Sequence, residues 1–282
     1  AEILGSLKDM SVEDKRKYGS LINNTKKEME EAYQKELNFY GKNDKIELSS
    51  IYYYKDAIMS ELKNIKGLPS SLLDMDGLKI YTNLDVDIQK ELEHNIDNEM
   101  KDTTLQVASI VIEPTTGKIV ALIGGKDYSK SQFNRVTSSK RQVGSTIKSL
   151  LYYSALENGF TPSSTFLSER TTFNIGNTTY SPKNASNIYA NKNISMLTAL
   201  SYSDNIYAMK THLFLGMDNL SKMGKRLKIN TPIKENASSA LGTTEINMID
   251  YSNAFITLAN EGEHVTPHII EKITDNNDRI LY

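Results

Sequence analysis

The sequence predicts a mixed α/β (α+β) domain preceded by a helical region. The first 75 or so residues are rich in Lys and Glu, and apolar residues recur there at helical spacing. From Gly77 onward, short apolar strands alternate with helical segments and polar turns. We therefore divide the chain into a helical linker or pedestal over residues 1–76 and a folded domain over residues 77–282.

The composition narrows the class of protein. The 282 residues carry a net charge of −2, with 39% hydrophobic and 24% charged residues. This balance supports a sizeable core and argues against a nucleic-acid-binding surface. Cys is absent, which excludes disulfides, thiolate zinc sites and cysteine nucleophiles. Pro267 separates His264 from His268, so we predict no metal site and no cofactor.

In the helical region, residues 26–33 and 53–62 have helical spacing. Ser11 followed by Glu13 and Asp14 is typical of a helix start with acids in its first turn. Apolar spacing predicts another helix over residues 53–62. The alternating charges indicate a solvated face rather than a binding patch. Through Glu13-Asp14-Lys15-Arg16 and Gly19, residues 1–37 resemble the helical arm of phenylalanyl-tRNA synthetase α subunits, a likeness that brings no catalytic residue with it.

The first part of the folded domain is predicted to form mainly strands. The predicted elements are a strand over residues 78–82, a helix from Asp87 to about Met100, and strands over residues 107–112 and 119–123. Pro114-Thr115-Thr116-Gly117 is a turn sequence, so the last two strands should form a hairpin. The polar residues 126–143 are predicted to be a loop.

The rest of the domain is predicted to form mainly helices. The predicted elements are a helix from near Ser145 to Gly159, a small hairpin around residues 173–180, helices near 195–215, 217–227 and 245–261, and a strand near 268–274. Gly159 can take the left-handed conformation that ends a helix.

Two serines are followed by Lys three residues later: Ser60 by Lys63, and Ser145 by Lys148. Residues three apart share a helix face, so the amine can act as the base that a serine nucleophile needs. Ser60 lies inside a charged helix and is interpreted as a surface residue. Ser145 lies at a loop-to-helix junction, where the helix N-terminus favours developing negative charge. From position alone, Ser145 could equally be a helix N-cap with a solvent-facing Lys148.

Ser203-Asp204-Asn205 is the one Ser-x-Asn in the sequence. A second serine with an amide two residues later can relay a proton and hold a substrate carbonyl. Residues i and i+2 do not share a helix face, so the motif predicts a turn between helices over residues 195–202 and 206–215. The alternative is an ordinary polar turn.

Further segments match one family in order. Ser-x-x-Lys with Ser-Asp-Asn is a known pattern of penicillin-binding proteins and class A β-lactamases. The matching segments are residues 77–85, 112–125, 133–135, 141–148, 180–184, 199–205, 241–245 and 259–262. Over residues 46–282 the chain resembles the transpeptidase domain of class A (bifunctional) penicillin-binding proteins.

This resemblance implies a fold, a reaction and a set of site residues. The fold would be the serine penicillin-recognising fold, a central antiparallel sheet flanked by helices. The reaction would be D,D-transpeptidation, which cross-links peptidoglycan stem peptides through an acyl-enzyme and is inhibited covalently by β-lactam antibiotics. Ser145 would be the nucleophile and Lys148 its base. Ser203 would shuttle a proton, and Asn205 would bind the substrate amide.

The sequence departs from the family at two points. Ser149 replaces the Pro that usually follows the lysine, which leaves the catalytic groups unaffected. No Lys-Thr-Gly or Lys-Ser-Gly occurs, and Lys210-Thr211-His212 lies on a predicted helix. We therefore predict that the domain is incomplete at its C-terminus and that a second chain carries the third motif. The resemblance also implies a parent protein anchored at the extracytoplasmic face of a bacterial membrane, although no signal peptide or anchor is visible in this sequence.

Three other functions remain open. A class A β-lactamase would need a carboxylate base in a Glu-x-x-Leu-Asn run, and none follows Asn205. A β-lactam-sensing receptor domain would be acylated but would signal instead of cross-linking. A structural domain would have lost catalysis along with its third motif.

Overall fold

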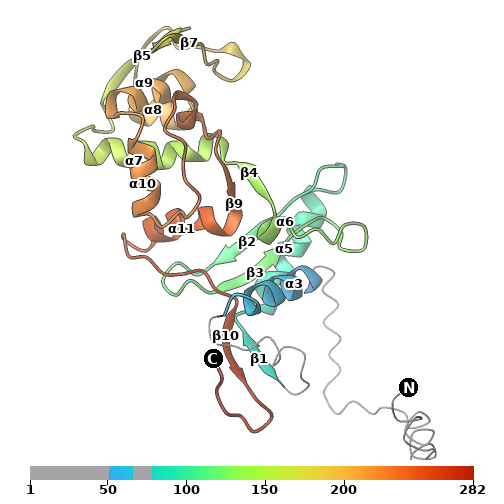
Figure 1. The fold of residues 1–282 in the computed structure, drawn as a ribbon. Coiled ribbons are helices and arrows are strands. Elements are labelled where there is room, and N and C mark those ends of the chain that lie inside the picture. Colours follow the sequence, from blue (N-terminus) through green and yellow to red (C-terminus); the bar gives the residue numbers. More distant parts are fainter. Residues whose placement is uncertain (1–50, 66–77) are drawn as a thin grey trace, which may run out of the picture. The chain divides into compact units, whose positions relative to one another are not determined.

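The computed structural model describes residues 51–65 and 78–282 (Figure 1). The predicted helix start at Ser11 and the synthetase-like segment over residues 1–37 lie outside these ranges. The helices are α3 (Ile51–Leu62), α5 (Val86–Glu99), α6 (Arg135–Ser138), α7 (Ile147–Glu157), α8 (Met196–Ser201), α9 (Asn205–Leu215), α10 (Asn219–Arg226) and α11 (Met248–Ala259), with 3₁₀ turns η1 (Gly144–Thr146), η2 (Ala185–Asn187) and η3 (Ala237–Leu241). The strands are β1 (Lys79–Thr82), β2 (Ser109–Ile112), β3 (Ile119–Ile123), β4 (Lys140–Gln142), β5 (Thr165–Ser168), β6 (Phe173–Ile175), β7 (Thr178–Tyr180), β8 (Lys192–Ser195), β9 (Glu245–Asn247) and β10 (Ile270–Thr274).

Every strand pair in the described ranges is antiparallel. The pairs are β1–β10, β2–β3, β4–β9, β5–β8 and β6–β7. The mixed α/β class and the two predicted hairpins, β2–β3 and β6–β7, are confirmed. The other three pairs join segments that are distant in the sequence, which no local pattern could predict.

Helix α3 packs against the β2–β3 hairpin. Tyr53 and Tyr54 are buried in one apolar cluster with Ile119 and Leu122 of β3. The hydroxyl of Tyr54 donates a hydrogen bond to the Ile119 carbonyl at 2.7 Å. The predicted helix over residues 53–62 is thus confirmed, and its aromatic face is buried against a strand.

The helices after Ser145 form the largest core. Leu150 and Leu151 of α7, Ile206 and Tyr207 of α9, and Leu220 of α10 belong to one buried cluster. In Figure 1 these helices lie together, with β5 and β7 beyond them. Burying a Leu or Ile side chain contributes about 1.5–3 kcal/mol, so this cluster is the rigid support on which the candidate site residues are mounted. None of the helices in the described ranges is both long and apolar enough to cross a bilayer.

The structure corrects the prediction for residues 126–143. This segment is not one loop, since it contains α6 and β4. All three side chains of β4 are exposed, so no apolar alternation marked it as a strand. Asn247 holds the segment in place, because its Nδ2 donates to the carbonyls of Val136, Thr137 and Ser139. Its Oδ1 caps α11, which explains why the helix predicted from residue 245 begins three residues later, after β9.

Candidate active site

Ser145 lies in the 3₁₀ turn η1, just before α7, and is exposed. The turn is held by a close approach between two backbones. Gly144 has a φ of 58° and donates from its N to the Gly242 carbonyl at 3.0 Å. Gly242 has a φ of 71°, and a Cβ there would overlap the backbone of Gly144. Glycine is therefore required at residue 242 for both reasons.

Lys148 lies one turn later on α7 and reaches the Ser-Asp-Asn turn. Its Nζ donates to the Ser203 carbonyl at 2.6 Å, to Ser203 Oγ at 2.9 Å and to Asn205 Oδ1 at 2.6 Å. The residue is only 1% exposed. The solvent-facing Lys148 of the N-cap interpretation is thus wrong, and three of the four sequence-selected site residues lie together.

The Ser-Asp-Asn motif forms the turn between α8 and α9, as its spacing predicts. Ser203 has a φ of 53°, in the left-handed region that few residues other than Gly adopt. Backbone conformations of this kind cost about 1–3 kcal/mol and persist where the surroundings enforce them. The turn directs both the carbonyl and the hydroxyl of Ser203 at Lys148.

Burial lowers the pKa of the Lys148 amine from 10.5 to about 8, while the nearby carboxylate of Asp204 opposes this shift. Burial removes water from the charged form and so favours the neutral amine. A lysine with a pKa near 8 has an appreciable neutral fraction at physiological pH, which a general base requires. The environment of Lys148 therefore suits proton transfer.

Two residues of the site were not selected from the sequence. Asp204 is 5% exposed and caps α9 by accepting from the Tyr207 N–H at 2.8 Å. Its other oxygen accepts from Ser168 Oγ at 2.5 Å and from Asn184 Nδ2 at 2.7 Å. An Asp directly before a helix is a recognisable N-cap signal. Nothing local in the sequence indicated the contact with Asn184.

The hydroxyl of Ser145 is not yet engaged. Within the described ranges, no hydrogen bond joins Ser145 to Lys148 or to Ser203, although Lys148 lies one turn away on the same helix start. Catalytic hydrogen bonds are often long in a free enzyme and tighten with substrate. A cavity of about 770 Å³ lies beside the nucleophile turn, lined by Val143, Thr146 and apolar groups that include Tyr251 and Phe255.

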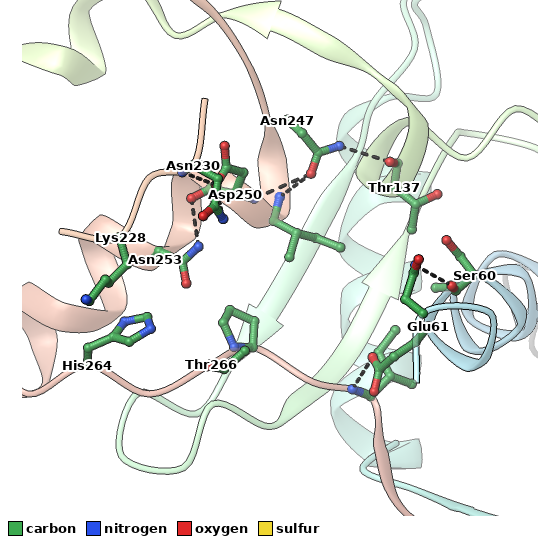
Figure 2. A pocket seen from close by; sticks show the side chains of 15 residues that line it. Ser60, Glu61, Thr137, Lys228, Asn230, Asn247, Asp250, Asn253, His264 and Thr266 are labelled. Carbon is green, nitrogen blue, oxygen red and sulfur yellow. Dashed lines mark hydrogen bonds between the residues drawn. The ribbon is translucent and has the colours of Figure 1, made fainter. Parts of the chain in front are cut away.

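The other Ser-x-x-Lys lies elsewhere. Ser60 lines a polar cavity of about 520 Å³. Figure 2 shows Ser60 and Glu61 on one side of this cavity and Lys228 and His264 on the other. Glu61 accepts hydrogen bonds from the backbone N–H groups of Ile269 and Ile270 at 2.8 and 3.0 Å. Ser60 thus sits beside a structural contact, among none of the groups that surround Lys148.

Comparison with known proteins identifies two families in different parts of the chain. The penicillin-binding protein transpeptidase domain family matches residues 107–280. The N-terminal domain of class II aminoacyl-tRNA synthetases matches residues 1–39, in line with the second resemblance noted in the sequence.

Penicillin-binding proteins of several bacteria are similar to this chain in sequence or in structure. Penicillin-binding protein 2D of Bacillus subtilis is 40% identical over 92% of this chain and 38% of its own length. Penicillin-binding protein 1A of Aquifex aeolicus is 32% identical over 91% of this chain and 35% of its own length. The crystal structure of penicillin-binding protein 1A from Haemophilus influenzae has a TM-score of 0.58 and 30% identity, covering 63% of this chain and 27% of that one.

A more distant structure supports the fold. PonA1 of Mycobacterium tuberculosis, in complex with penicillin V, has a TM-score of 0.71 at 20% identity and covers 83% of this chain and 65% of that one. The chain spans little more than a third of the two bacterial relatives named above. The family match covers more than half of the chain and includes Ser145, Lys148 and the Ser-Asp-Asn turn. The chain therefore belongs to the penicillin-binding protein transpeptidase domain family.

Proposed function

We propose that this chain carries the acylating part of a serine D,D-transpeptidase that cross-links peptidoglycan stem peptides. The observation that carries the proposal is the set of contacts of Lys148. A buried amine with a lowered pKa lies one turn after Ser145 and is bound to Ser203 and Asn205. This arrangement suits activation of a serine hydroxyl by a neighbouring base.

In the proposed reaction, Ser145 Oγ attacks the carbonyl of the penultimate D-Ala of a stem peptide. Neutral Lys148 accepts the hydroxyl proton, and Ser203 passes a proton to the nitrogen of the leaving D-Ala. Asn205 binds the substrate amide and holds Lys148. The Ser145 N–H stabilises the oxyanion together with a second N–H on a strand. An amine of a neighbouring stem peptide then attacks the acyl-enzyme, which forms the cross-link and frees Ser145.

β-Lactam antibiotics are proposed as covalent inhibitors of the same serine. They present a strained amide to Ser145, and the ring-opened product stays attached to it. Since no carboxylate base is recognisable after Asn205, water should hydrolyse this adduct slowly. Slow hydrolysis is the behaviour expected of a transpeptidase, whereas a β-lactamase would release the adduct quickly. We place the reaction at the extracytoplasmic face of a bacterial membrane, to which an anchor in the parent protein would attach it.

We also propose that a segment outside these 282 residues, carried on a second chain, brings the third motif. Two observations support a further segment beside the site. In the described ranges β2 pairs with β3 alone, so its other edge has no strand beside it. Ala108, which precedes β2, lines the same 770 Å³ cavity as Val143 and Thr146. A segment that covers this cavity would come close to the nucleophile turn.

The proposal is tested by labelling the full-length protein with a fluorescent penicillin. Ser145→Ala should abolish covalent labelling, because it removes the nucleophile and leaves the packing of α7 unchanged. Ser60→Ala is the matched control, and we expect it to label like the wild type. Labelling that persists in Ser145→Ala, or that is lost in Ser60→Ala, would mean that the nucleophile is assigned wrongly.

A further inference from the structure

Lys183 and Asn184 contact the Ser-Asp-Asn turn from a segment about twenty residues earlier. Asn184 Nδ2 donates to Asp204 Oδ2 at 2.7 Å, and Asn184 Oδ1 accepts from the Asn205 N–H at 2.8 Å. Asn205 Nδ2 donates to the carbonyl of Lys183 at 2.7 Å. One amide thus binds two consecutive residues of the turn, and the preceding carbonyl binds the side chain of the second.

These contacts determine which end of the Asn205 amide faces Lys148. Because Nδ2 is held by the Lys183 carbonyl, Oδ1 points at Lys148 Nζ, 2.6 Å away. The reversed amide would direct N–H donors at an amine that is itself a donor. The Lys183 carbonyl therefore fixes the orientation of Asn205 that Lys148 needs.

Asn184 also affects the electrostatic field of the Asp204 carboxylate. Asp204 is buried, and its carboxylate is the charged group whose field raises the pKa of Lys148. The N–H of Asn184 points at this carboxylate and disperses part of its negative charge. Without that donor, the field of Asp204 at Lys148 would be stronger.

The segment that carries Asn184 is itself tied down. Asn184 Nδ2 also donates to the Ile188 carbonyl at 3.1 Å, across the η2 turn. Within that turn, Ser186 has a φ of 53°. On the far side, the Asn191 N–H donates at 2.8 Å to the carbonyl of Ser168, whose hydroxyl also binds Asp204. Both ends of the segment are thus connected to the same carboxylate.

We propose that Asn184 is a positioning residue for acylation, holding Asp204 and Asn205 in the arrangement that orients Lys148. This inference rests on the proposed function, since it assigns Asn184 a role in activating Ser145. Asn184 touches neither Ser145 nor Lys148, so it acts through the two residues that it binds.

The elements packed against Lys148 carry few other titratable groups. The pKa of Tyr207 on α9 is raised to about 12 by burial, and burial raises that of Tyr152 on α7 further. Elements α8 and η3 contain no titratable side chain. The remaining charged groups on α9 and α10 have partners elsewhere or are exposed: Lys210 binds the Leu167 carbonyl, His212 the Asn236 carbonyl, Lys222 pairs with Asp218, Arg226 with Glu157, and Lys225 is exposed. We therefore assign a change in the pH profile near pH 8 to Lys148, whose pKa depends on burial and on the field of Asp204.

The test measures the second-order rate constant for acylation of the full-length protein by a fluorescent penicillin between pH 6 and 10. Asn184→Leu removes the side-chain hydrogen bonds to Asp204, Asn205 and the Ile188 carbonyl at similar size. Asn184→Ala removes them without adding bulk if the Leu variant does not fold. We expect the rate at pH 7 to fall about tenfold. We also expect the rising limb of the pH–rate profile, the range in which the rate increases with pH, to move to higher pH. Asp204→Asn removes the opposing charge and should move the limb to lower pH.

Asn177→Leu is the matched control, because Asn177 is exposed in the β6–β7 turn and its side chain makes no hydrogen bond within the described residues. It should leave both the rate and the limb unchanged. If the Asn184 variants acylate with wild-type rate and limb, or if their limb moves to lower pH, the positioning role is wrong. If wild-type protein is not labelled at Ser145 at all, the proposed function itself fails, which is a distinct result.

Discussion

At Lys148, burial and an acidic neighbour act on the same amine in opposite directions. Burial lowers its pKa and Asp204 raises it, and burial dominates, leaving a pKa of about 8. The three protons of a charged amine are all used by the contacts to Ser203 and Asn205. Only the neutral amine has a lone pair for the Ser145 proton, so protonation of Lys148 should control acylation.

This gives a prediction for the pH dependence of acylation. Since the neutral amine is the competent form, the acylation rate should rise about tenfold per pH unit below pH 8 and level off above it. Lys148→Arg, which stays protonated, should reduce the rate by about 10²–10⁴-fold. Stopped-flow absorbance with a chromogenic β-lactam measures both. A limb near 10.5, the ordinary value for lysine, would show that burial does not tune this residue.

How far the sequence predicts the site depends on the range of the interaction. Ser145, Lys148, Ser203 and Asn205 were chosen from spacing and family resemblance, and Lys148 does contact the last two. Asn184 lay inside a matched segment, but its bonds to Asp204 and Asn205 exist only after folding. The sequence also left open whether Lys148 faced solvent, and packing of α7 against α9 decided that question.

Among the elements, the β4–β9 ladder and the Gly144–Gly242 contact support the nucleophile turn. β4 ends at Gln142 and leads directly into η1, and β9 begins three residues after Gly242. A local pattern predicted the β2–β3 hairpin, where a turn sequence joins two apolar runs. It could not predict β4, whose residues are polar and exposed and whose partner lies more than a hundred residues later.

A substitution at Gly242 tests whether its contact with Gly144 supports the nucleophile turn. Gly242→Ala would place a Cβ against the Gly144 backbone as well as forcing a non-Gly residue to a φ of 71°. We expect it to lower the free energy of unfolding by roughly 3 kcal/mol or more and to slow acylation, because Gly144 precedes the nucleophile. Chemical denaturation and penicillin labelling measure the two effects.

Gly159→Ala is the matched control for backbone strain. Gly159 has a φ of 88°, but a Cβ added there would meet no other atom within 4 Å. The loss there should be only about 1–2 kcal/mol, with unchanged acylation by the folded fraction. Equal effects of the two substitutions on acylation would mean that the contact between Gly144 and Gly242 does not hold the nucleophile turn.

For the whole molecule, we propose that residues 1–282 need a further segment, because within the described ranges β2 pairs with β3 alone and a cavity lies beside Ala108, just before β2. Leu105 is 69% exposed and Phe255 39% exposed, and both line this cavity. An uncovered apolar face and an unpaired strand edge are typical of a surface that another segment covers. The turn sequence between two apolar runs predicted the β2–β3 hairpin. It could not show that the other edge of β2 has no partner strand within the described ranges.

We therefore predict that residues 1–282 alone will not form a stable, fully reactive unit. After refolding, this chain should lack a sharp cooperative thermal transition and should be labelled poorly by penicillin. Adding a polypeptide that carries the Lys-Thr-Gly or Lys-Ser-Gly motif should restore both. Differential scanning calorimetry and gel labelling of the same samples measure this. A sharp transition with full labelling of the chain alone would contradict the prediction.

The most direct test of the account is to locate and time the covalent adduct. Full-length protein is treated with benzylpenicillin, digested with trypsin and analysed by mass spectrometry. We predict that the adduct lies on the peptide Gln142–Lys148, which contains Ser145, and that it persists for many minutes. An adduct on the peptide Asp56–Lys63, which contains Ser60, or turnover at about 1–10³ per second, would contradict the account.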